Sequence, residues 1–106
     1  MKILPEISAI STDLEEIYKD LHSHPELGFE EVRTSEIVQK KLEEYGVDEI
    51  HKNIGKTGVI AVIKGNGSGG NRSVGLRADM DALPIQETTG LPYASKYDGK
   101  IVIYHL

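Results

Sequence analysis

Residues 46–63 read GVDEIHKNIGKTGVIAVI, and they decide the fold because the spacing of apolar residues changes within them from helical to strand-like. Residues 49–54 are expected to form a short edge strand. Residues 59–63 are a β-branched run with a turn signal on each side, which is the pattern of a buried strand. A small sheet is therefore expected to begin here.

Two helices are predicted N-terminal to this sheet. The sequence TDLE has the form of a capping box, so the first helix is expected to begin at Thr12. It should end near His24, because the residue before Pro25 avoids the helical conformation. The second helix is expected over residues 31–45, with Gly46 as its C-terminal cap.

A glycine-rich loop and a third strand are expected after the second strand. Residues 65–71, GNGSGGN, contain the G-x-G-x-x-G spacing of dinucleotide-binding proteins, but that site requires a helix immediately afterwards. Residues 73–77 have a strand pattern instead, so we favour a hairpin loop. The sequence thus predicts an α/β fold in which two helices pack on a small sheet of about three strands.

Composition limits the classes of function. The chain has 106 residues, enough for one domain, and its 27% charged content is ordinary for a globular protein. The net charge of -5 and the lack of a Lys/Arg run argue against nucleic-acid binding. The apolar runs are too short to span a bilayer, and the first residues do not resemble a signal peptide. Zero cysteines exclude disulfides and thiolate metal sites, and a cytoplasmic location is expected.

Histidines at the end of the first helix are one candidate site. His22 and His24 form an H-x-H pair that could bind a metal if it lay on a strand. At a helix end the two rings point in different directions, and neither has a partner ligand nearby in sequence. A packing or capping role is therefore favoured over metal binding. His51 and His105 are isolated.

Two aspartates at the end of the third predicted strand are the other candidate site. In an extended segment Asp79 and Asp81 point to the same side, so both carboxylates could face one site. Their repulsion is tolerable only with a cation, a shared proton or open solvent. An Asp-rich turn before Leu83-Pro84 is the competing interpretation, and spacing alone does not separate the two.

Two longer motifs resemble a known family of hydrolases. Residues 22–31, HSHPELGFEE, and residues 76–85, LRADMDALPI, resemble segments of bacterial hippurate hydrolases and plant auxin-conjugate hydrolases of the peptidase M20 family. Residues 93–95 and 98–100 extend the resemblance, which covers about residues 10–100. It implies the N-terminal part of a zinc-peptidase-like catalytic domain.

The resemblance also implies a chemistry. These hydrolases cleave the amide bond of N-acyl amino acids with two divalent metals, zinc or manganese, that activate a water molecule. Asp81 matches a carboxylate that lies just behind the metals in the wider superfamily. Asp79 falls where the superfamily motif has a metal-binding histidine. In the hydrolases the first ligands come from an MHACGHD segment directly after the Gly-Lys pair that matches Gly99-Lys100 here.

The sequence departs from the family at residues 101–106, IVIYHL. We therefore expect residues 1–106 to be a truncated N-terminal part of the catalytic domain with a non-family tail, from a frameshifted or truncated reading frame rather than an engineered tail. In that case the chain binds no metal and is inactive by itself, because water activation needs the metal ligands.

Two other classes of function stay open. The first is a small homo-oligomeric interaction module, because a sheet that lacks neighbours exposes strand edges and the tail at residues 101–106 is β-prone. The second is a binding domain for an anionic ligand near Arg77. Self-association would favour the first, and a bound ligand the second.

Overall fold

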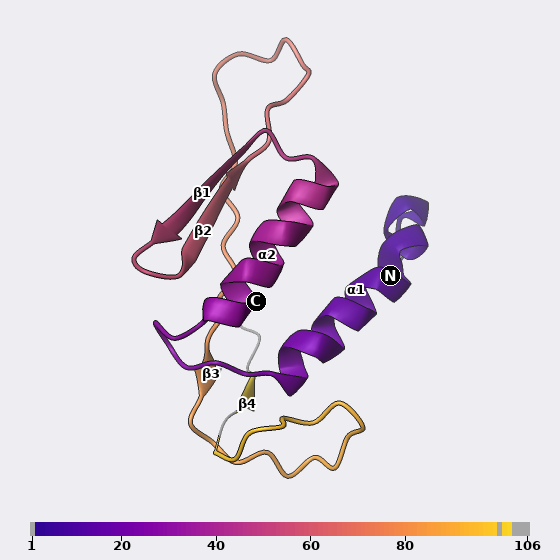
Figure 1. Cartoon of the computed structure of the whole chain (residues 1–106). Helices are drawn as coiled ribbons and strands as arrows, with labels where there is room; N and C mark the ends of the chain where they lie inside the picture. Colours follow the sequence, from indigo (N-terminus) through magenta and orange to yellow (C-terminus); the bar gives the residue numbers. More distant parts are fainter. Residues whose placement is uncertain (1, 100, 103–106) are drawn as a thin grey trace.

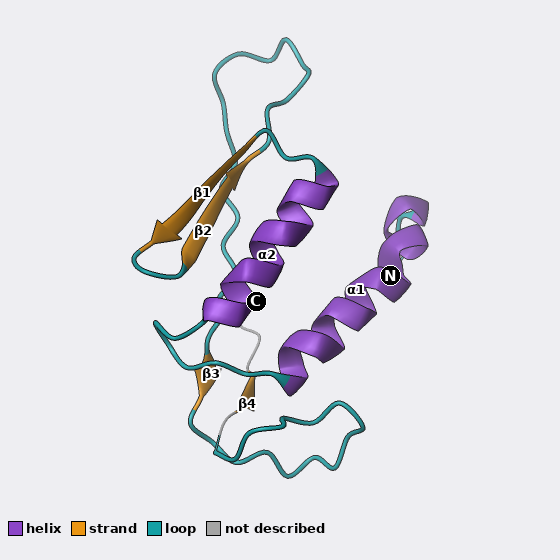
Figure 2. Cartoon of the chain, in the orientation of Figure 1, coloured by secondary structure: helices purple, strands orange, loops and turns teal. Residues whose placement is uncertain are grey.

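The computed structural model describes residues 2–99 and 101–102 (Figure 1). Two helices come first, then a two-stranded hairpin, and last a pair of very short strands (Figure 2). The elements are α1 (Pro5–Ser23), α2 (Val32–Tyr45), β1 (Glu49–Ile54), β2 (Gly58–Val62), β3 (Ala82–Leu83) and β4 (Ile101–Val102). No helix in the described part of the chain is long and apolar enough to cross a membrane.

The helix α1 begins earlier than the capping box indicates. Its first residue is Pro5 rather than Thr12, and Leu4 in an extended conformation is the N-cap. Proline suits this position, because its fixed φ fits the first turn and its missing N–H would have had no partner there. The predicted start was therefore wrong. The end at Ser23, shortly before Pro25, agrees with the prediction.

The helix α2 agrees with its predicted range, except that Glu31 is the N-cap rather than the first helical residue. Gly46 has a left-handed φ of 74°, and its N–H donates to the carbonyl of Glu43 at 3.1 Å. The N–H of Val47 donates to the carbonyl of Leu42 at 3.3 Å. This is the expected glycine cap of a helix C-terminus.

The hairpin of β1 and β2 confirms the two strands predicted from residues 46–63. The strands pair antiparallel, with Glu49 opposite Val62 and His51 opposite Ile60. In Figures 1 and 2, α2 runs beside this hairpin, and it contacts both strands. The second strand is not buried as expected, since Ile60 is half exposed and the other residues of β2 are only partly covered.

The third predicted strand, at residues 73–77, is not present in the structure. The loop at residues 65–71 accordingly leads into a segment that joins neither sheet of the described residues, and the hairpin interpretation of that loop was wrong as well. Strand formation needs a neighbour for the backbone groups, and β2 pairs only with β1 among the described residues. The fold class holds, with two helices and small antiparallel sheets.

A second small sheet joins distant parts of the chain. β3 and β4 pair antiparallel, with Ala82 opposite Val102. The front of the predicted tail, Ile101–Val102, thus pairs within the chain. Residues 103–106, which include His105 and the rest of that tail, lie outside the described residues.

The interior of the described part contains mostly polar residues. Ala82 is its only buried apolar residue besides Pro25. The buried polar side chains lie at the end of α1 and the start of α2, and they are His22, Ser23, Glu31, Thr34 and Ser35. Burying polar groups is tolerable only when they are hydrogen-bonded, so hydrogen bonds must hold this region together.

Candidate functional site

The two family-like motifs meet in space. Leu27 of the first forms a parallel β-bridge with Ala82 of the second, and the N–H of Ala82 donates to the carbonyl of Glu26 at 2.7 Å. A Cβ placed on Gly28 would lie 3.8 Å from a carboxylate oxygen of Asp81. The HPELGFEE turn therefore lies directly against the end of the segment that carries the aspartates.

Glu26 caps the N-terminus of α2 from the preceding loop. Its carboxylate accepts hydrogen bonds from the N–H groups of Arg33 at 3.0 Å and Thr34 at 2.6 Å, and from the hydroxyl of Thr34 at 2.7 Å. The first N–H groups of a helix have no partner within the helix, and a negative charge is favourable there. The side chain of the N-cap residue Glu31 makes no capping hydrogen bond, so Glu26 takes this role.

Glu31 connects the helix to the turn before β2. It is buried, and its carboxylate accepts a hydrogen bond from the hydroxyl of Thr57 at 2.6 Å. One turn further along α2, the hydroxyl of Ser35 donates to the carbonyl of Thr57 at 2.7 Å. Two hydrogen bonds therefore fix the hairpin relative to α2.

His22 holds the loop after β3 against α1. Its Nε2 lies 2.6 Å from a carboxylate oxygen of Glu87, and the two side chains are only 8% and 2% exposed. The ring of His22 also stacks on Tyr18 and meets the edge of Tyr93. A packing or capping role was predicted for His22 and His24 together, and these contacts give His22 a packing role.

The carboxylate of Glu87 is stabilised in its ionised form. The hydrogen bond from the hydroxyl of Thr89 is the main reason why the pKa of Glu87 lies below its usual value. Burial works in the opposite direction, while the N–H of Ser95 and the ring of His22 lower the pKa further. Glu87 is thus the centre of a buried polar cluster that organises residues 86–97.

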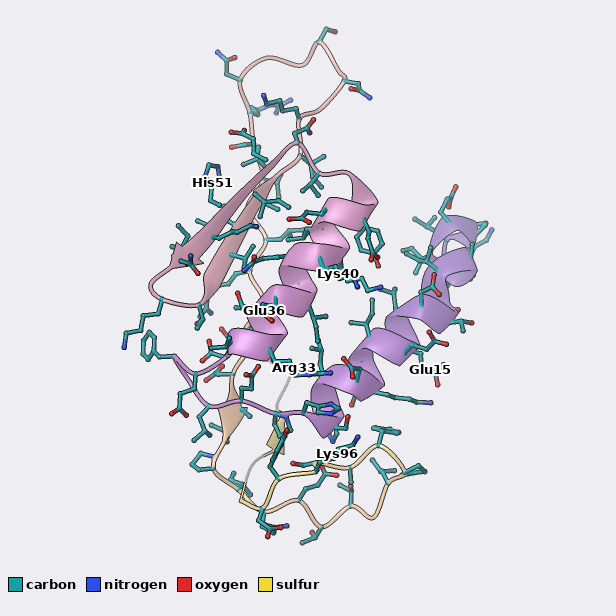
Figure 3. All side chains as sticks on the ribbon, viewed as in Figure 1. Glu15, Arg33, Glu36, Lys40, His51 and Lys96 are labelled. Atoms are coloured by element: carbon teal, nitrogen blue, oxygen red, sulfur yellow. The ribbon has the colours of Figure 1, made fainter. Side chains whose placement is uncertain are left out.

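His24 makes different contacts from His22. It is the C-cap residue of α1, and its Nδ1 lies 2.9 Å from the carbonyl oxygen of Asp20. Arg33 reaches across from α2 to the carboxylate of Asp20 at 2.8 Å, in the space between the helices where Figure 3 labels it. Of the packing or capping role predicted for the two histidines, His24 therefore has the capping one. Within residues 2–99 and 101–102, no three His, Cys, Asp or Glu side chains are grouped to hold a metal.

Asp79 and Asp81 line one cavity of about 480 Å³ between the turn after Leu27 and the start of β2. The residues between and before the two aspartates line this cavity as well, so the shared side that the spacing indicates stays a prediction. A side-chain oxygen of Asp79 lies 2.7 Å from the guanidinium of Arg77, which offsets the repulsion between the two carboxylates. The hydrogen bonds and ion pairs of the described residues include none to Asp81, which is partly exposed.

Sequence reasoning missed the glutamates that build this region. Glu26 and Glu31 both lie in the HPELGFEE motif, and Glu87 follows β3. The available signal was that Glu26 lies before the predicted helix and Glu31 at its first residue, where negative charge is favourable. The partner of Glu87 is 65 residues away, and local sequence gives no sign of it.

The fold and the two adjoining motifs are similar to one part of known hydrolases. Hippurate hydrolase of Campylobacter jejuni is 49% identical over 96 residues, which is 91% of this chain and 24% of that protein. N-acetylcysteine deacetylase of Bacillus subtilis is 50% identical over 91 residues, which is 86% of this chain and 23% of that protein. No protein-family model matches the chain.

A solved structure agrees with these relatives. The crystal structure of the Bacillus subtilis YXEP protein, described as a dinuclear metal binding peptidase from the M20 family, matches with a TM-score of 0.79 and 49% identity. The match covers 89% of this chain and 26% of that one. The resemblance to the M20 hydrolases is thus confirmed, and the chain spans about a quarter of the length of the relatives it matches.

Proposed function

We propose that this chain is part of a metal-dependent amidohydrolase that cleaves the amide bond of N-acyl amino acids. The observation that carries the proposal is the contact between the two motifs at Leu27 and Ala82, in a chain about half identical to such hydrolases. Hippurate is N-benzoylglycine, and the names of the other relatives, N-acetylcysteine deacetylase and N-acetyldiaminopimelate deacetylase, also denote N-acyl amino acid substrates. The shared substrate class is therefore an acylated amino acid.

Asp81 is the residue that we assign to the metal centre, as a supporting carboxylate. It faces a cavity, and no hydrogen bond or ion pair within residues 2–99 and 101–102 occupies its oxygens. One such carboxylate does not make a dinuclear site, and the described residues provide no cluster of three ligands. They therefore do not fit two metals by themselves, and we derive no catalytic step from them. Residues other than those described must supply the ligands.

In this proposal, the 106-residue chain alone does not hydrolyse N-acyl amino acids. It also does not retain zinc or manganese in stoichiometric amount. Elemental analysis after dialysis, combined with assays on N-benzoylglycine and N-acetylcysteine, measures both. One tightly held metal per chain with measurable turnover would contradict this part of the proposal.

A chimeric protein tests whether this chain can serve as part of an active hydrolase. This chain's residues would replace the matching 96-residue segment of Campylobacter jejuni hippurate hydrolase. We expect the chimera to hydrolyse N-benzoylglycine, and Asp81→Asn in it to lower kcat while leaving the folded structure intact. Asp98→Asn, at an exposed carboxylate, is the matched control. A folded chimera without activity, or equal activity of both variants, would overturn the assignment.

A homo-oligomeric interaction module is the second candidate. The observation in its favour is the number of large apolar side chains on the surface, including Val74 and Leu76 in the unpaired segment after the glycine-rich loop. Contiguous exposed apolar surface is typical of interaction sites. Light scattering on the purified chain at micromolar concentration distinguishes an oligomer from a monomer.

A further inference from the structure

The glycine-rich loop after β2 carries the pair Asn66–Gly67 at its exposed surface. In Figure 1 this loop projects beyond the end of the hairpin, and residues 64–73 are all exposed. The base of the loop is fixed, because the N–H of Lys64 donates to a carboxylate oxygen of Asp48 at 2.5 Å. Beyond that point, residues 65–71 take part in no hydrogen bond with any residue that the structure describes. The described part of the chain therefore does not restrain the backbone around this pair.

An asparagine that precedes a glycine can react with the next backbone nitrogen. The nitrogen of Gly67 loses its proton and attacks Cγ of Asn66. The new N–Cγ bond closes a five-membered succinimide ring, while the Cγ–NH2 bond breaks and ammonia leaves with the proton that the nitrogen lost. A water molecule then adds to one of the two ring carbonyl carbons and breaks its bond to the nitrogen. The product at position 66 is an aspartate or an isoaspartate, and no oxidant or reductant is needed.

Two features of the structure favour this reaction at Asn66. Gly67 has no Cβ to hinder the approach of its nitrogen, and its N–H donates to no described group. Intramolecular attack is fast when the backbone can bring the two reacting atoms to about 3–3.5 Å. We propose that Asn66 is a site of spontaneous deamidation in this chain. Each event replaces a neutral amide with a carboxylate in the loop next to β2, and it makes the net charge of -5 more negative by one charge.

The other two asparagines of the chain serve as internal references. Asn53 lies in β1 and precedes Ile54, whose β-branched side chain crowds the backbone nitrogen. Asn71 is exposed like Asn66, but it precedes the long side chain of Arg72. Exposure alone therefore does not distinguish residues 66 and 71, whereas the glycine that follows residue 66 does.

A second acid–glycine pair shows how the fold can restrain the same chemistry. Asp98 precedes Gly99, and an aspartate at this position forms the same succinimide by losing water instead of ammonia. Here, however, the N–H of Gly99 donates to a side-chain oxygen of Gln86 at 2.6 Å. This hydrogen bond holds the proton on the nitrogen and fixes the local backbone, so the attack is slowed at residue 98 but not at residue 66.

Peptide mapping by mass spectrometry measures the reaction directly. The purified chain is incubated at mildly alkaline pH, and the conversion of each asparagine is followed over days. We expect Asn66 to convert about tenfold faster than Asn71, and Gly67→Ala to slow Asn66 by about the same factor. Alanine fits at position 67, because an added Cβ has its nearest heavy atom at 3.9 Å. Equal rates at residues 66 and 71, or an unchanged rate in Gly67→Ala, would overturn the proposal.

A second variant separates the effect of the fold from that of the dipeptide. Asp98→Asn places an identical asparagine–glycine pair where the glycine N–H is hydrogen-bonded. In the folded chain we expect position 98 to convert about tenfold more slowly than Asn66, and Gln86→Ala to remove this protection. In concentrated urea, where the hydrogen bond is lost, the two positions should convert at similar rates. Equal rates in the folded chain, or a difference that persists in urea, would refute the role of the free backbone. None of these measurements depends on hydrolase activity.

Discussion

The cap that Glu26 provides for α2 leads to a quantitative prediction. Glu26→Ala removes the acceptor for two helix N–H groups and for the hydroxyl of Thr34. Loss of a helix N-cap costs about 1–2 kcal/mol. Thr34 is only 5% exposed, so its hydroxyl loses its partner in a buried position, which adds about 1–2 kcal/mol. We therefore expect a total destabilisation of about 3 kcal/mol.

Amide hydrogen exchange is the suitable assay, because it reports on the first turn of α2 even if the whole chain is marginally stable. In Glu26→Ala the amides of Arg33 and Thr34 should exchange about a hundredfold faster, since each 1.4 kcal/mol corresponds to about a factor of ten. Glu26→Gln, which keeps one acceptor oxygen, should give about half of the free-energy change. Glu30→Ala, at an exposed neighbouring glutamate, is the control. Exchange in Glu26→Ala within a factor of two or so of the control would refute the capping role.

Two further predictions concern pH and backbone conformation. The folded structure lowers the pKa of Glu87. The ionised Glu87 carboxylate therefore stabilises the fold at pH values above the ordinary glutamate pKa of about 4.3. This stabilisation is lost as the pH falls through the lowered pKa of the folded state. The NMR signals of the Tyr93 ring, which contacts His22, should therefore change in acid below about pH 4, and Glu87→Gln should remove this dependence. Gly46→Ala should lower the stability of α2 by about 1 kcal/mol, because the left-handed φ of 74° is strained for alanine, whereas Gly65→Ala should not destabilise the chain. Urea titrations followed at 222 nm compare the two glycine variants, and equal midpoints would contradict the second prediction.

Local patterns predicted the elements whose stability depends on neighbouring residues in the sequence. The range of α2 and its cap at Gly46 follow from periodicity and from one residue with a left-handed backbone. The hairpin of β1 and β2 follows from two strand-like runs joined by a short turn. The start of α1 was missed because a capping-box pattern at Thr12 was given more weight than the proline at position 5, which is favourable in a first turn.

Features that depend on residues far apart in the sequence could not be predicted from local sequence patterns. Residues 73–77 have a strand composition, but a strand exists only when another strand pairs with it, and no described strand does so. The buried pair of His22 and Glu87 joins positions 65 residues apart. Asp79 and Asp81 line the same cavity, but so does Met80 between them, so the shared side expected from an extended backbone stays a prediction. Whether Asp81 supports a metal centre stays a prediction.

The acidic residues near the two motifs differ in whether their carboxylate oxygens accept hydrogen bonds. Glu26, Glu31 and Glu87 are each engaged by helix amides, hydroxyls or a histidine, and these contacts hold α1, α2 and the later loop in place. Asp81 lies close to Gly28 in the same region, and among the described residues no hydrogen bond or ion pair engages its carboxylate. We therefore expect Asp81→Asn to perturb the fold less than a change at Glu26. Loss of activity after a change at Glu26 would therefore reflect folding, whereas loss at Asp81 with the fold retained would reflect the chemistry of the site.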